Sequence, residues 1–213
     1  MKIKYLAHSA FLITSEKGMR ILTDPYTTLP WMLHGAIKET ADIVTVSHEH
    51  GDHNNASAVK GNPKIVKDSQ EVKGISIKAV ATAHDDKGGS QRGKNTIFCF
   101  SLDGINVCHA GDLGHELTID QVKAIGNVDV LMIPVGGLFT IDAATAAKVC
   151  EQLKPKVIIP MHFKTDKLNL PVSGVEDFIK GKNNVTRSSD SEIELKADKL
   201  PASAQIVVLK QSL

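Results

Sequence analysis

The residues best suited to chemistry lie in the run Ser-His-Glu-His-Gly-Asp-His at positions 47–53, directly after an apolar segment. On an extended chain, side chains two positions apart point the same way, so His48 and His50 would leave the strand end side by side. A turn at the intervening glycine would let Asp52 and His53 face the same point. Imidazole and carboxylate groups suit zinc and similar metals. One ion could not easily use all four groups, so the run predicts two neighbouring ions.

Three further candidate ligands lie downstream, and each follows a short apolar or β-rich run: His84, Asp112 and His162. Residues in such places are expected at strand ends along one rim of a sheet. A single histidine is more often packed or solvated than bound to a metal. The cluster at 47–53 and the order of the later residues favour ligation for this set.

The order of these residues resembles the metallo-β-lactamase superfamily of metal-dependent hydrolases: HxHxDH, a single His, Gly-Asp and a late His. Ile-Leu-Thr-Asp-Pro at 21–25 is similar to the early Asp motif of that family. The segments 5–13 and 134–140 are similar to compact hydrolases related to the L-ascorbate-6-phosphate lactonase. The resemblance runs from Asp24 to His162, most of the expected single domain 1–213.

The resemblance implies a fold and a ligand set. The fold is an αββα sandwich of two mixed sheets with outer helices, whereas periodicity alone indicates only α/β or α+β. Two divalent ions are implied, zinc first, with manganese or iron(II) also accepted by such ligands. One ion would take His48, His50 and His84; the other would take Asp52, His53 and His162; Asp112 would bridge them.

The implied reaction is hydrolysis of a lactone, ester or phosphoester by a hydroxide that two ions share. Asp52 is the candidate catalytic residue, either as a ligand that orients the nucleophile or as a proton shuttle. The alternative is a metal-binding protein without turnover, for sensing or structure. Structural zinc sites usually close their coordination with four protein groups, which argues against that alternative.

Other residues are expected around the centre. Asp24 should be a buried carboxylate hydrogen-bonded behind the HxHxDH loop. His8 and His115 are candidates for similar supporting positions, against ordinary core or surface roles. The polar segment 85–95 resembles a mobile loop. Its Arg92, or Lys164 near the last ligand, would bind an anionic group of the substrate.

Apolar and β-branched runs predict strands near 3–6, 10–15, 20–23, 43–46, 64–66, 75–81, 96–102, 105–109, 128–133, 157–160 and 205–209. Helical patterns predict helices at 118–125, 142–153 and 173–179. Residues 26–40 are expected to form a loop whose apolar tip, around Trp31, would cap the pocket or seat a second copy of the chain.

Composition narrows the partners. The chain has 213 residues, 25 Lys+Arg and 24 Asp+Glu, so its net charge of +1 gives no overall field for nucleic acid or membrane. A β-like start and the lack of a long apolar span lead us to expect a cytoplasmic protein with a small-molecule substrate. The three cysteines are expected as buried free thiols.

Overall fold

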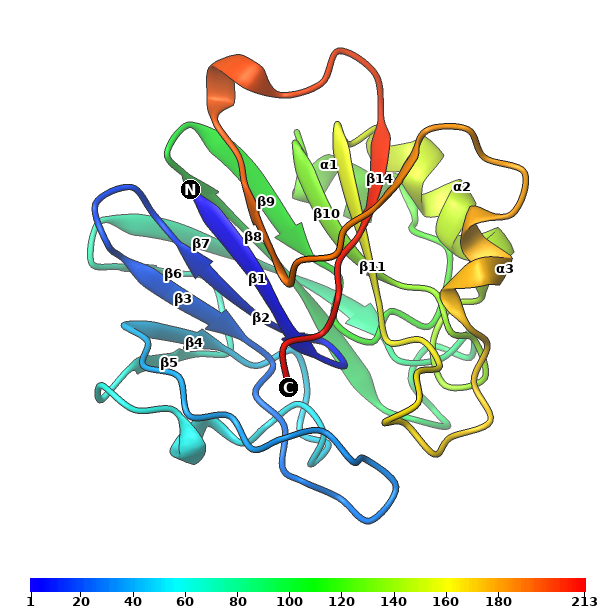
Figure 1. Cartoon of the computed structure of the whole chain (residues 1–213), viewed down its shortest axis with the longest axis horizontal. Helices are drawn as coiled ribbons and strands as arrows, with labels where there is room; N and C mark the ends of the chain where they lie inside the picture. Colours follow the sequence, from blue (N-terminus) through cyan, green and yellow to red (C-terminus); the bar gives the residue numbers. More distant parts are fainter.

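The computed structural model describes residues 1–213 and consists of two β-sheets packed face to face (Figure 1). The first sheet has six strands in the order β13 (Glu192–Glu194), β1 (Lys2–Ala7), β2 (Ala10–Thr14), β3 (Arg20–Thr23), β4 (Ile43–Thr45) and β5 (Lys64–Val66). The second has eight strands in the order β12 (Val185–Arg187), β14 (Gln205–Val208), β11 (Val157–Met161), β10 (Val130–Pro134), β9 (Ile105–His109), β8 (Lys94–Leu102), β7 (Ile75–Ala83) and β6 (Gln70–Val72).

Strand direction decides where the candidate ligands meet. In the eight-stranded sheet β9, β10 and β11 are parallel, and β8 is antiparallel to both β7 and β9. Strands β7, β9 and β11 therefore run the same way and end at one edge. His84, Asp112 and His162 follow those three strands directly or within three residues, so the topology places them along a single rim.

The main core is a single cluster of 45 buried apolar residues, which fills the space between the sheets and continues beneath the helices on the eight-stranded sheet. Strands β10 and β11 are buried along their whole length, as expected for central parallel strands covered on both faces. Strand β7 instead alternates buried and exposed residues over most of its length. The helices are α1 (Ile119–Ile125), α2 (Ala143–Leu153) and α3 (Val175–Ile179), with short 3₁₀ turns at Ala56–Ala58 and Ala197–Lys199.

The three helices belong to the eight-stranded sheet, because α1 packs on β7, α2 packs on β10, and α3 packs on α2 (Figure 1). The outer face of the six-stranded sheet is covered differently. Leu6, Leu12 and Leu22 of that sheet join a second cluster of 15 buried residues with Tyr26 and Met32 of the loop. A long loop thus takes the place of a helical layer on this side.

The sequence-based α+β sandwich is confirmed. Three short strands were not predicted (β6, β12 and β13), because each has only three residues and carries charged or polar side chains. The third helix begins two residues later than expected, with Gly174 as its N-cap. No helix in the structure combines the length and apolar character that crossing a bilayer requires.

Candidate metal centre

Asp112 lies in the middle of the converging side chains. Its Oδ2 is 3.2 Å from Nε2 of both His53 and His84, 3.4 Å from Nε2 of His162 and 3.9 Å from Nε2 of His48. These imidazoles come from both of the ligand sets that the sequence predicts. One carboxylate therefore sits within reach of both, which is the position that a bridging ligand requires.

The first set is His48, His50 and His84, whose ligand atoms all lie within 4.8 Å of one another. We call it the outer trio. His48 and His84 are buried, but His50 is exposed. The His50 ring lies 4.7 Å from the His48 ring and 5.1 Å from the His84 ring, centroid to centroid. These three imidazoles could hold a cation at a place that is open to solvent.

The second set is Asp52, His53 and His162, which we call the inner trio. His8 joins it, and the ligand atoms of all four lie within 4.8 Å of one another. His8 Nε2 lies 3.2 Å from Asp52 Oδ2, and the His8 ring lies 4.1 Å from the His162 ring. His8, predicted only as a supporting candidate, is therefore in direct contact with this trio.

Asp24 orients the histidines of both trios from behind, as expected. Its Oδ2 lies 2.9 Å from Nδ1 of His53 and accepts a hydrogen bond of 2.5 Å from the Ser47 hydroxyl. Because the Ser47 hydroxyl donates its only hydrogen to Asp24, its oxygen must accept the hydrogen bond of 2.9 Å from Nδ1 of His48. Both rings then carry a hydrogen on Nδ1, which leaves Nε2 as the atom that would offer its lone pair to a cation at the centre.

Several buried polar atoms around Asp112 have no hydrogen-bond partner. They include Nε2 of His48, Nε2 of His53 and Oδ1 of Asp112. Buried polar groups are normally satisfied, because leaving one without a partner costs about 1–3 kcal/mol. Lone pairs of nitrogen and carboxylate oxygen that converge without donors fit divalent cations. The residues present therefore suit the metals that the sequence predicts.

The electrostatics agree with that fit. Burial lowers the pKa of His48 to about 3, so this ring is neutral near pH 7. Burial also disfavours charge on His53, but the carboxylates of Asp112 and Asp24 outweigh it and raise the pKa of His53 well above its usual value. The histidines in turn outweigh burial at Asp112 and hold the pKa of its carboxyl well below the usual range. The negative charge of the carboxylates is balanced by a proton on His53 in the metal-free protein. A divalent cation would balance it more fully.

The backbone is unusual around the centre. His8, Asp24 and His162 have φ of 56°, 41° and 51°, in the left-handed region that non-glycine residues rarely adopt. Gly111, with φ of 57°, precedes Asp112 where a Cβ would meet Asn95 Oδ1 at 2.4 Å. Such conformations persist where the surroundings enforce them, and they cluster at functional sites. Only glycine fits between Asn95 and the bridge position.

The structure separates the other candidates. His115 supports the chain next to His84: its Nε2 accepts from the Ala83 amide at 3.1 Å. Lys164 lies elsewhere, with its Nζ donating to the carbonyl oxygens of Leu168 and Leu170. His109, expected in the core, is fully buried and donates from Nε2 to the Ser9 carbonyl at 2.9 Å.

Sequence reasoning missed two supporting residues. Asn95 accepts from the Asp112 amide at 2.9 Å and donates to the Ala110 carbonyl, so it fixes the turn that carries Asp112. No local motif marks Asn95. Asp85 directly follows His84, and its carboxylate accepts four backbone amides of residues 87–92. That aspartate before a glycine-rich stretch was the available signal for an ordered loop, where we expected a mobile one.

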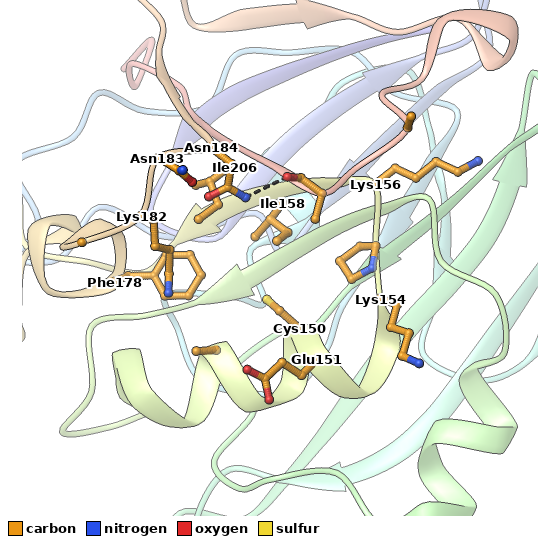
Figure 2. Close-up of a pocket in the computed structure, with 15 residues that line it drawn as sticks. Cys150, Glu151, Lys154, Lys156, Ile158, Phe178, Lys182, Asn183, Asn184 and Ile206 are labelled. Carbon is orange, nitrogen blue, oxygen red and sulfur yellow. Dashed lines mark hydrogen bonds between the residues drawn. The ribbon is translucent and has the colours of Figure 1, made fainter.

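A hollow of about 210 Å³ opens over the centre; its lining consists of Trp31, His50, Asp52, His84, Arg92, Asp112, Phe139, His162 and Leu170. A larger hollow of about 710 Å³ lies between α2, α3 and the starts of β11 and β14 (Figure 2). It contains none of the trio residues, because β11 begins there and reaches His162 only after its opposite end. Size alone would therefore select the wrong site.

Comparison with known proteins agrees with the geometry. Residues 2–162 match the family described as the β-lactamase superfamily domain. A UPF0173 metal-dependent hydrolase of Carboxydothermus hydrogenoformans is 31% identical over 194 residues, 78% of this chain and 85% of the relative. One of Thermococcus kodakarensis is 32% identical over 197 residues, again 78% and 85%.

Among solved structures, a Thermotoga maritima protein described as a Zn-dependent hydrolase of the metallo-β-lactamase superfamily has a TM-score of 0.81 and 39% identity, covering 98% of this chain and 97% of that one. The diiron β-hydroxylase CmlA of Streptomyces venezuelae has a TM-score of 0.56 at 13% identity, covering 76% and 44%. That second likeness concerns the fold alone, and a fold does not decide the chemistry. The chain belongs to the metallo-β-lactamase superfamily and, within it, to the UPF0173 metal-dependent hydrolases.

Proposed function

We propose that the protein is a dinuclear metal-dependent hydrolase acting on a small ester, lactone or phosphoester. The observation that carries this proposal is the position of Asp112 between the two trios, with one carboxylate oxygen near imidazoles of both and the other without a partner. Mononuclear sites need no such bridge. Zinc is the proposed metal, with manganese and iron(II) as alternatives that the same ligands accept.

When bound, two such ions would polarise the substrate oxygen and supply a shared hydroxide near neutral pH. The protein's own residues then have distinct tasks. Asp112 sets the separation of the two trios. Asp52 presents its carboxylate at the hollow, where it can hold the proton of the attacking group or deliver it to the leaving group.

His8 keeps Asp52 in place. Burial lowers the pKa of His8 to about 4, so the ring is neutral and its Nε2–H donates to Asp52 Oδ2 at 3.2 Å. Although burial disfavours charge on Asp52, the His8 hydrogen bond and the His53 charge keep the pKa of its carboxyl below its usual value. Asp52 is therefore ionised at neutral pH, as a ligand or proton acceptor must be.

The test is a substrate panel with measured metal content. Protein reconstituted with zinc, manganese or iron(II) is assayed on 4-nitrophenyl acetate, δ-valerolactone and bis(4-nitrophenyl) phosphate, with metals counted by mass spectrometry. We expect two ions per chain and turnover of at least one compound class. Asp52→Asn should lower kcat at least a hundredfold and change metal content less. One ion per chain, or no turnover with any metal, would contradict the proposal.

A further inference from the structure

Arg92 is the one arginine of the chain without a carboxylate partner. Of the three arginines, Arg20 pairs with Glu39 and Arg187 pairs with Glu176. No acidic group lies within 4 Å of the Arg92 guanidinium, which is stacked 4.6 Å from the ring centroid of Phe139. It is half-buried and lines the hollow over the metal centre. A half-buried, unpaired guanidinium beside a reaction centre is suited to binding an anion.

The loop that carries Arg92 is ordered before any ligand arrives. The Asp85 carboxylate accepts backbone amides of Lys87 and Gly89 through Oδ1, both at 2.8 Å. Through Oδ2 it accepts those of Gln91 at 3.0 Å and Arg92 at 2.7 Å. Because Asp85 adjoins the ligand His84, the guanidinium is held relative to the outer trio. Such preorganisation reduces the entropy lost when a ligand binds.

The charges around the central hollow favour an anion on one of its sides. On one side, a hollow of about 400 Å³ shares His50 and Arg92 with the central one and also contains Lys94 and Lys67. Lys67 is paired with Glu49 at 2.6 Å, whereas Lys94 has no acidic partner. Two uncompensated cations therefore face this side.

A second neighbouring hollow has an acidic lining. A hollow of about 470 Å³ shares His84, Arg92 and Phe139 with the central one, and it is lined by Asp86, Glu116 and Asp142, among others. Glu116 is paired with Lys148, but Asp142 has no basic partner and Asp86 meets only the exposed Lys87. An anionic substituent would be repelled there, so Arg92 separates an anion-accepting side from an anion-rejecting one.

We propose that Arg92, assisted by Lys94, binds an oxyanion group of the substrate that is distinct from the bond cleaved. The substrate class is then a small ester, lactone or phosphoester that carries a second acidic group, either carboxylate or phosphate. The central hollow of about 210 Å³ is below the 300–1,000 Å³ usual for larger ligands. This inference rests on the proposed function, because the hollow belongs to the proposed reaction centre.

The test uses binding rather than turnover, with three hydroxamic acids that chelate metals. Acetohydroxamate has no acidic tail, succinomonohydroxamate has a carboxylate tail, and phosphonoacetohydroxamate has a phosphonate tail. Affinities for the zinc-loaded protein are measured by calorimetry. We expect at least one acidic compound to bind about tenfold more tightly than acetohydroxamate, and the stronger of the two identifies carboxylate or phosphate as the preferred group.

Variants assign that preference to Arg92. Arg92→Gln should remove it at unchanged zinc content, Arg92→Lys should keep part of it because lysine offers a point charge without the planar fork, and Lys94→Gln should reduce it about threefold. Arg187→Gln, a distant surface arginine, is the matched control and should keep all of it. The inference is overturned if the wild type binds the three compounds equally or not at all, or if Arg92→Gln retains the preference.

The same experiment separates this inference from the proposed reaction. A wild type that prefers the acidic hydroxamates through Arg92 but hydrolyses nothing in the panel would refute the reaction and leave the anion site standing. A wild type that hydrolyses the neutral panel esters but binds all three hydroxamates equally would do the reverse.

Discussion

The two trios differ in how firmly the protein holds them. In the inner trio, two of the three ligands are hydrogen-bonded, His53 to Asp24 and Asp52 to His8, and the side chains of His53 and His8 are completely buried; only His162 has no such partner. In the outer trio, the His50 side chain is exposed and makes no hydrogen bond, although the His48 ring is fixed by Ser47. Ligands that are oriented before binding lose less entropy when the ion arrives. The inner trio should therefore bind its ion first and release it last.

The largest effect is expected at the residue that the trios share. Asp112→Ala removes the carboxylate whose Oδ2 lies within 4 Å of Nε2 of histidines from both trios, so the variant should retain at most one ion and lose at least a thousandfold in kcat/KM. Mass spectrometry of the dialysed protein and the panel assay measure both quantities. Asp129→Asn, at a surface pair with Lys156, is the control for a lost carboxylate. A variant that kept two ions and its rate would show that Asp112 is not a bridge.

A smaller effect on metal binding is expected at the exposed end of the outer trio. His50→Ala should lower metal content from two ions to one and abolish activity, because His50 reaches solvent and no neighbour can replace it. Glu49→Ala changes the adjacent side chain, which faces Lys67 and Asn54, and should keep both ions. If His50→Ala lost both ions together, the trios would load as one unit and the contrast between them would disappear.

The supporting carboxylate should matter less than a ligand. Asp24→Asn keeps the shape of the side chain but weakens the acceptor behind His53, so the affinity of the tighter ion should fall about 10–100-fold. Chelator competition with a zinc indicator measures that constant. An effect confined to the weaker ion would show that Asp24 acts mainly on the outer trio, through Ser47, and would contradict this prediction.

The smallest expected effect is a pH dependence of the metal-free protein. Burial disfavours the charged form of His53 and of His84. The neighbouring carboxylates outweigh burial at His53, and Asp112 outweighs it at His84, so the pKa of both histidines is raised. Their stabilisation is fully present below the ordinary value near 6.5 and is lost as pH rises through the raised values. His8 and His48 have a lowered pKa, so above pH 7.5 they are neutral in both the folded and the unfolded protein and add nothing to the pH dependence of stability.

Urea unfolding of chelated protein should thus give a lower midpoint at pH 8.5 than at pH 7.5. The zinc-loaded protein should not show this loss, because the cation replaces the proton. A chelated protein whose midpoint rose over the same interval would contradict the charge balance inferred for the inner trio.

The sequence predicted the candidate metal ligands more completely than it predicted the residues that support them. His48, His50 and His53 sit in one short run, and their spacing is a local property that a strand end and a turn convert directly into geometry. The sandwich was predictable because long apolar strands and capped helices are local patterns too. Asn95 is different: it is one polar residue in a strand, and only the pairing of β8 with β9 brings it beside Asp112. The hairpin of β8 and β9 is itself a local pattern, closed by Asp103-Gly104, but nothing in the sequence shows which polar residue of β8 meets the turn that follows β9.

The covering of the six-stranded sheet was equally hidden. Residues 26–40 were predicted as a loop, and they are one, but their role as a substitute for a helical layer depends on Tyr26 and Met32 meeting Leu22 across space. The order of the 85–92 loop was missed for another reason. Its glycines and charges are typical of mobile segments, and the stabilising contacts converge on a single aspartate.

The hydrogen bonds of Asp85 affect how the substrate selectivity of this hydrolase can evolve. Asp85 holds the main chain of the loop by hydrogen bonds to its backbone amides, while the side chains of residues 86, 87, 90 and 91 are exposed to solvent. Exchanges at those positions, or of Arg92 itself, would alter what the entrance favours while leaving His84 and its neighbours where they are. The loop that would set selectivity is held by Asp85, next to the candidate ligand His84, yet its exposed side chains can change without moving that ligand.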